Sequence, residues 1–71
     1  MSEKELLKRI GNKIKELRTE KGISQQELAS KCDFEKSNMS RIESGNTNPT
    51  VGTLFKISQA LKIDLSELLT D

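Results

Sequence analysis

At the start of three predicted helices the sequence places a short polar residue three positions before a glutamate, which is the spacing of a helix-capping box. The pairs are Ser2 with Glu5, Ser24 with Glu27, and Asp64 with Glu67. Apolar residues recur after these starts at spacings of three and four, the period of one helix face. Valine and isoleucine do not alternate with polar residues over the length of a strand. The pattern therefore predicts an all-α fold.

The spacing predicts five helices joined by short turns. Gly22 ends the first helix just after its C-cap, and Gly11 within that helix indicates a close approach of another helix. A run of turn formers at 46–49 precedes a fourth helix that Thr50 caps. The predicted helices cover residues 3–21, 25–32, 35–44, a stripe from 51 to 61, and 64–69. Their apolar faces carry Leu7, Ile10, Ile14, Leu17, Leu28, Ala29, Cys32, Met39, Ile42, Val51, Leu54, Ile57 and Leu61.

A length of 71 residues suits one small domain, predicted to span residues 1–71. The sequence has one cysteine, Cys32, and no histidine, which excludes an intrachain disulfide, a Ser-His-Asp arrangement and a typical zinc site. Cys32 lies on an apolar face and is predicted to be a small buried side chain rather than a nucleophile. We therefore expect no enzyme activity, no cofactor and no metal.

Membrane association is not indicated by the hydropathy of the chain. Residues 1–9 contain no long apolar run, and no stretch approaches the roughly 20 apolar residues that span a bilayer. We expect a cytoplasmic protein without a membrane partner.

Charge is unevenly distributed along the chain. The net charge is +1, but Asp64, Glu67 and Asp71 are three of its 11 acidic residues, so residues 1–62 carry 12 basic and 8 acidic residues, a net +4. A field of that sign weakly favours phosphate. Two phenylalanines without tyrosine or tryptophan argue against single-strand binding by stacked aromatic rings.

Residues 22–45 carry the strongest functional signal. Two short predicted helices are joined by residues 32–35, the length of a helix-turn-helix connection. At about 100° per residue, one arc of about 140° on the second of these helices holds only polar residues, and none is acidic. An ordinary solvated face is the alternative to groove reading, although exposed faces usually mix both charge signs. The arc contains Lys36, Ser37, Ser40, Arg41 and Ser44.

Several segments together resemble the Cro/Xre family of phage and bacterial regulators, which have lambda-repressor-like domains. Residues 22–29 (GISQQELA) resemble the opening of its helix-turn-helix, and residues 37–45 (SNMSRIESG) resemble its recognition helix. The first and fourth helices match through Ile14, Leu17, Arg18, Asn48, Pro49, 54–57, Ala60 and Leu61. The resemblance covers about residues 10–69. It implies a compact five-helix bundle whose helix-turn-helix spans about residues 24–45.

The resemblance also implies roles for individual residues. The residues matched to base contacts or to positions flanking them are Lys36, Ser37, Asn38, Ser40 and Arg41. The residues matched to DNA backbone contacts are Gln25, Ser44 and Asn46. For Gln25 the physics agrees, because a helix N-terminus offers free N–H groups to an anion. A solvent-exposed helix start is the alternative for that residue.

Two further matched residues are structural in the family, and three positions depart from its pattern, one of which is Gly52 in the first turn of the fourth helix. Arg18 and Glu43 match an ion pair between the first and third helices, which Glu43 would need if it is buried. Asp33 stands where the turn commonly has glycine, and aspartate tolerates the left-handed conformation. Glu35 replaces the usual serine or threonine cap, so it supports the helix start through the helix dipole alone.

Together these features predict a homodimeric transcriptional regulator, a repressor that reads a palindromic operator in double-stranded DNA. One recognition helix reads only a few base pairs, so two half-sites are the usual solution. The alternative is an antitoxin or coactivator-like module that uses the same bundle to bind a toxin or the transcription machinery. Leu65, Leu68 and Leu69 in the last helix suit either interface, and the alternative is that all three cover the core of a single copy.

Overall fold

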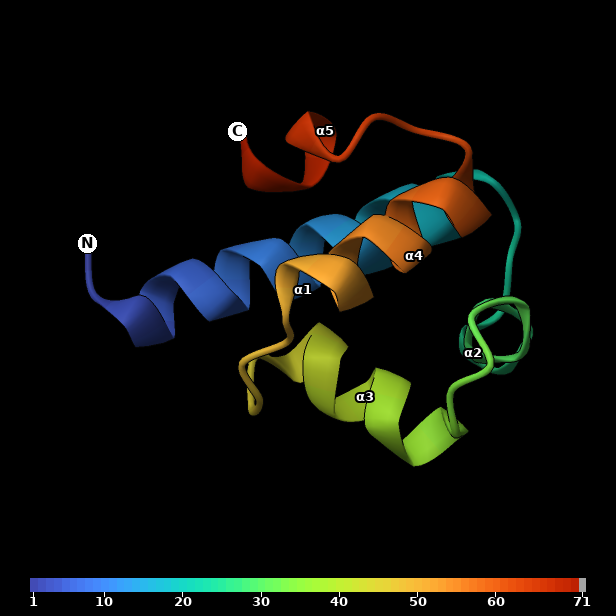
Figure 1. The fold of residues 1–71 in the computed structure, drawn as a ribbon, viewed down its shortest axis with the longest axis horizontal. Helices are drawn as coiled ribbons and strands as arrows, with labels where there is room; N and C mark the ends of the chain where they lie inside the picture. Colours follow the sequence, from blue (N-terminus) through green and yellow to red (C-terminus); the bar gives the residue numbers. More distant parts are fainter. Residues whose placement is uncertain (71) are drawn as a thin grey trace.

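The computed structural model describes residues 1–70 and is all-helical over that range (Figure 1). Its helices are α1 (Glu3–Glu20), α2 (Gln25–Lys31), α3 (Lys36–Ser44), α4 (Val51–Leu61) and α5 (Ser66–Leu69). The prediction of an all-α fold with five helices is confirmed. Asp71, the last residue of the predicted domain, lies outside the described residues.

Side-chain caps explain where three of the helices begin. The Ser2 hydroxyl accepts from the Glu5 backbone N–H at 3.2 Å, and the Glu5 carboxylate accepts from the Ser2 N–H at 3.4 Å, which completes the predicted capping box. Ser24 and Thr50 each accept from the N–H three residues later, at 3.0 Å and 3.1 Å. These bonds satisfy donors that have no partner inside the helix.

The start of α5 differs from the prediction by two residues. The Glu67 carboxylate accepts from the Asp64 N–H at 3.1 Å, so only one half of the predicted capping box is present. The backbone bonds from Glu67 to Asp64 and from Leu68 to Leu65, both 3.0 Å, span three residues. Because such bonds wind the chain more tightly than an α-helix, the α-helical part begins only at Ser66.

The longest helix, α1, is the centre of the arrangement and contacts all four of the others. In Figure 1, α4 crosses in front of α1, α5 lies above it, and α3 lies below it with α2 seen end-on beside α3. α3 therefore occupies the edge of the molecule opposite α5, packed on α1 and α2. Within residues 1–70, none of these helices combines the length and hydropathy needed to cross a membrane.

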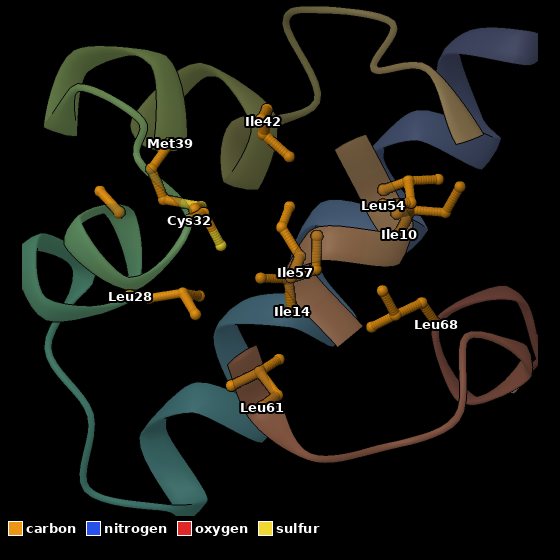
Figure 2. Packing of buried hydrophobic residues seen from close by; sticks show 11 residues of the cluster. Ile10, Ile14, Leu28, Cys32, Met39, Ile42, Leu54, Ile57, Leu61 and Leu68 are labelled. Carbon is orange, nitrogen blue, oxygen red and sulfur yellow. The ribbon is translucent and has the colours of Figure 1, made fainter. Parts of the chain in front are cut away.

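Apolar side chains from all five helices meet in one core, with Ile14 and Ile57 near its middle (Figure 2). Cys32 is 4% exposed in this core, and burial raises the pKa of its thiol, which therefore stays neutral and packs as a small apolar group. The core residues are Ile10, Ile14, Leu28, Ala29, Cys32, Met39, Ile42, Leu54, Ile57, Leu61 and Leu68.

The prediction that Val51 belongs to the buried apolar stripe of the fourth helix is wrong, because its side chain is 71% exposed. At 100° per residue, Val51 points about 70° away from the mean direction of the buried side chains later in α4. It shares its direction with Phe55, one turn later, which is 51% exposed. The stripe read from spacing alone was therefore one residue too long at its start.

At Gly11 the backbones of α1 and α3 approach each other closely. A Cβ placed on Gly11 would lie 2.6 Å from the carbonyl oxygen of Ile42 and would also overlap the carbonyl oxygen of Glu43. No other residue type fits there without moving one of the two backbones. The predicted close approach of another helix at Gly11 is confirmed, and the approaching helix is α3.

Candidate nucleic-acid interface

The connection between α2 and α3 is a tight turn formed by residues 32–35. Asp33 adopts the left-handed conformation, with φ of 60°, at the position where the Cro/Xre pattern commonly has glycine. The Phe34 N–H donates to the Ala29 carbonyl at 2.8 Å and closes the end of α2. Glu35 then precedes α3 without a side-chain cap bond, as its residue type predicts. The two helices form a helix-turn-helix.

The structure brings the predicted α3 contact residues together on its outer surface. Met39 and Ile42 are 0% and 3% exposed and attach the inner side of α3 to the core, as Figure 2 shows. Across residues 1–70, no ion pair or side-chain hydrogen bond engages Lys36 or Arg41, so neither cation is neutralised by a neighbouring carboxylate. The exposed residues of α3 are Lys36, Ser37, Asn38, Ser40, Arg41 and Ser44.

The predicted backbone contacts lie where the chain leaves α3 and at the start of α2. After α3, Asn46 is exposed and its N–H donates to the Arg41 carbonyl at 2.9 Å, while the Ser44 hydroxyl donates to the same carbonyl at 3.1 Å. Gln25 begins α2 and is only half-buried. Its side-chain amide is directed inward rather than to solvent, since Nε2 donates to Oε1 of Glu43 at 3.2 Å.

The predicted ion pair between Arg18 and Glu43 is present and largely buried. Arg18 Nε lies 2.9 Å from Glu43 Oε2, and Nη2 lies 3.1 Å from Oε1, so the pair is bidentate. The side chains are 12% and 4% exposed. Arg18 Nη1 also donates to the Ile23 carbonyl at 2.9 Å, which fixes the segment between α1 and α2. One arginine thus ties three parts of the fold together.

The sequence did not reveal the bond from Gln25 to Glu43. A buried carboxylate needs hydrogen-bond donors for both of its oxygens. From the sequence one can therefore expect more than one donor to Glu43 if it is buried. The identity of the additional donor depends on how α2 crosses α3, which residue spacing does not determine. The Glu43 carboxylate consequently has three donors from two helices.

The surface beside α3 is hollowed and carries both acidic and basic groups. An open depression of about 410 Å³ is lined by Asp33, Phe34, Glu35, Ser37, Asn38 and Arg41. The acidic groups Asp33 and Glu35 lie at the end of α3 that faces α2, and Arg41 lies further along the helix. Among residues 1–70 there is no group of three or more histidine, cysteine, aspartate or glutamate side chains placed to hold a metal.

A profile of the helix-turn-helix family matches residues 14–68. The chain belongs to this helix-turn-helix family. It is 45% identical over 64 residues to the control protein C.MunI of a Mycoplasma species, and the match covers 89% of this chain and 86% of C.MunI. It resembles the solved structure of SinR, the master regulator for biofilm formation, in complex with DNA, with a TM-score of 0.79 and 44% identity over 86% of this chain and 98% of that one. It also resembles the restriction-modification controller protein C.AhdI of Aeromonas hydrophila, with a TM-score of 0.85 and 35% identity over 87% and 94% of the two chains.

The range matched to the helix-turn-helix family includes every predicted contact residue and the Arg18–Glu43 pair. The first turns of α1 precede the matched range. Gly11 lies in that preceding part, so the close contact between α1 and α3 is a feature that we derive from this structure itself.

Proposed function

We propose that this helix-turn-helix protein is a sequence-specific regulator of transcription, a repressor that reads the major groove of double-stranded DNA with α3. The observation that carries the proposal is the outer face of α3, which is exposed, contains no acidic residue and presents the cations of Lys36 and Arg41. The names of its relatives, a control protein and a regulator solved with DNA, support the same function. We also propose that residues 1–71 act as one domain, in the cytoplasm and without enzyme activity.

The chemistry of the exposed side chains suits this role. Arginine pairs two donors with O6 and N7 of guanine, while serine and asparagine bond to several base edges. We assign base contacts to Lys36, Ser37, Asn38, Ser40 and Arg41. Ser44 and Asn46 lie where the chain leaves α3, and we assign them to the sugar-phosphate backbone, which sets the register of the protein on the duplex. Gln25 at the start of α2 is the third candidate for a backbone contact.

Selection of bound duplexes from a random library tests the function directly. We expect enrichment of a palindromic sequence, because two copies of α3 would read related half-sites about 34 Å apart. Enrichment of one half-site without its inverted copy would contradict the dimer but not the DNA reading. Binding without any enrichment would contradict sequence-specific regulation and favour the protein-interaction module instead.

Replacing Arg41 with alanine is expected to weaken binding to the selected duplex by about 1–3 kcal/mol and to relax the preference at one position of each half-site. The reason is that an arginine fork discriminates guanine from the other bases. The measurement compares dissociation constants on the selected duplex and on its single-base variants. Lys62→Ala removes an exposed cation beyond α4 and is the matched control. Equal losses on selected and random DNA would show that Arg41 contacts phosphate only.

We further propose that two copies associate through α5. Leu69 is 52% exposed, while its neighbour Leu68 is buried at 2%. The side chain of Leu69 lines a groove of about 420 Å³ between α1 and α5 together with Leu6, which is 40% exposed. An interface this small is weak, so a monomer–dimer equilibrium that DNA shifts towards the dimer is expected.

Leu69→Lys is expected to leave the fold intact, to lower the dimer fraction in sedimentation and to remove cooperative binding to the palindrome. The fold survives because the side chain is already half in solvent. Phe55→Lys is the control, since Phe55 on α4 is 51% exposed and equally apolar but distant in sequence from α5. If Phe55→Lys disrupts the dimer and Leu69→Lys does not, the interface lies on α4.

A further inference from the structure

Near its C-terminal end, α3 lies against the backbone of α1. At Gly11 the backbones of α1 and α3 touch, with the carbonyl oxygens of Ile42 and Glu43 against the glycine. This contact sets how close the two helices lie. At the C-cap of α3, Gly45 also packs closely on the backbone of Lys8 in α1, since an added Cβ there would lie 2.9 Å from the Lys8 Cα. Both backbone approaches lie at one end of α3, so the tilt of the helix, and with it the position of its outer face, depends on the side chains around them.

The Glu43 carboxylate, at the same end of α3, accepts hydrogen bonds from two other helices. Arg18 from α1 donates to both of its oxygens, at 2.9 Å and 3.1 Å. Gln25 from α2 donates to Oε1 at 3.2 Å. Since the carboxylate is buried, each of these charge-assisted bonds is stronger than it would be in water. Of the three hydrogen bonds to this carboxylate, the one from Gln25 is the one that connects it to α2.

We infer that Gln25 is a positioning residue for the recognition helix, acting through the Glu43 carboxylate to set the angle of α3 on α2. Residues of α3 that read bases must be placed within a fraction of an ångström, so a small rotation of the helix misplaces all of them together. This inference rests on the proposed function, because it concerns how the same surface achieves its sequence preference.

A positioning role and a phosphate contact for Gln25 predict different effects on DNA binding. A residue that only anchors the DNA backbone contributes equally to every sequence, so its loss lowers all affinities by the same factor. A residue that orients α3 contributes mainly where the bases match. The second N–H of the Gln25 amide remains available for phosphate, so the two roles are compatible, and only the preference between sequences separates them.

The test is Gln25→Met, which keeps the length of the side chain and removes its donor. Dissociation constants are measured on the duplex selected by the parent and on a random duplex of the same length and salt. The selectivity ratio is the dissociation constant on the random duplex divided by that on the selected duplex. We expect this ratio to fall about tenfold, the scale of one hydrogen bond to a charged group. Gln25→Asn, whose amide is one carbon too short for Glu43, is expected to lower the ratio in the same direction and covers the case in which the methionine variant does not fold.

Two comparisons make the result specific. Gln26→Met changes the exposed neighbour on α2 and is expected to leave the ratio unchanged. In the Arg18→Met/Glu43→Leu background, Gln25→Met is expected to have no further effect on the ratio, because the carboxylate is gone. An unchanged ratio in both Gln25 variants, with or without a uniform loss of affinity, would overturn the inference. A parent that binds both duplexes equally would instead overturn the proposed function.

Discussion

Replacing Glu43 with leucine while Arg18 is retained is expected to lower the free energy of unfolding by about 3–5 kcal/mol. The change leaves a guanidinium that is 12% exposed without an acceptor for Nε and Nη2, and only the Ile23 carbonyl remains as its partner. A domain of this size has a total stability of only about 4–10 kcal/mol. The variant is therefore expected to lose a large part of its stability and to unfold at a clearly lower temperature and urea concentration than the parent.

The double variant Arg18→Met/Glu43→Leu distinguishes the effect of breaking the ion pair from the effect of changing two largely buried side chains. It removes both charges and replaces them with apolar groups of similar length, so it is expected to lose much less than the sum of the two single changes. Glu20→Leu is the matched control, because Glu20 is exposed and its replacement should change stability by no more than about 0.5 kcal/mol. Strictly additive losses for Arg18 and Glu43 would show that the two side chains are not energetically coupled.

The helices could be predicted from sequence because their determinants are local. Ser2, Ser24 and Thr50 each bond to a backbone N–H three residues away, and Gly22 adopts a φ of 69° directly after α1. Burial needed more than local information. Val51 fits the spacing of an apolar stripe, but no other helix covers the first turn of α4 on that side, which leaves it 71% exposed.

The candidate site shows the same division. Spacing was sufficient to gather the polar side chains of α3 on one face, because one helix alone determines which of its residues point together. The pairing of Arg18 with Glu43 came from the family resemblance and from the cost of burying a charge. The bond from Gln25 to Glu43 joins residues 18 positions apart on different helices, and it follows only from the crossing angle of α2 and α3.

Gly11→Ala is expected to destabilise the protein by about 3 kcal/mol, although alanine is the better helix former by about 1 kcal/mol. The added Cβ would lie 2.6 Å from the Ile42 carbonyl oxygen and would overlap that of Glu43. Backbone oxygens cannot rotate away as the tip of a side chain can. One of the two helices must therefore move away from the other, and a movement of α3 would also strain the bonds that hold Glu43.

Gly52→Ala is the matched control, because the same added atom in α4 would lie 3.7 Å from the Thr50 hydroxyl oxygen, an ordinary contact. We expect that change to stabilise the fold by up to about 1 kcal/mol, so the two glycines should respond with opposite signs in one denaturation experiment. The displacement of α3 adds a second readout. At a temperature where Gly11→Ala is still folded, its preference for the selected duplex over random DNA should fall, while Gly52→Ala should keep the preference of the parent. A Gly11→Ala variant that is less stable but fully selective would mean that α1 moves to accommodate the new atom and that the reading face of α3 stays where it is.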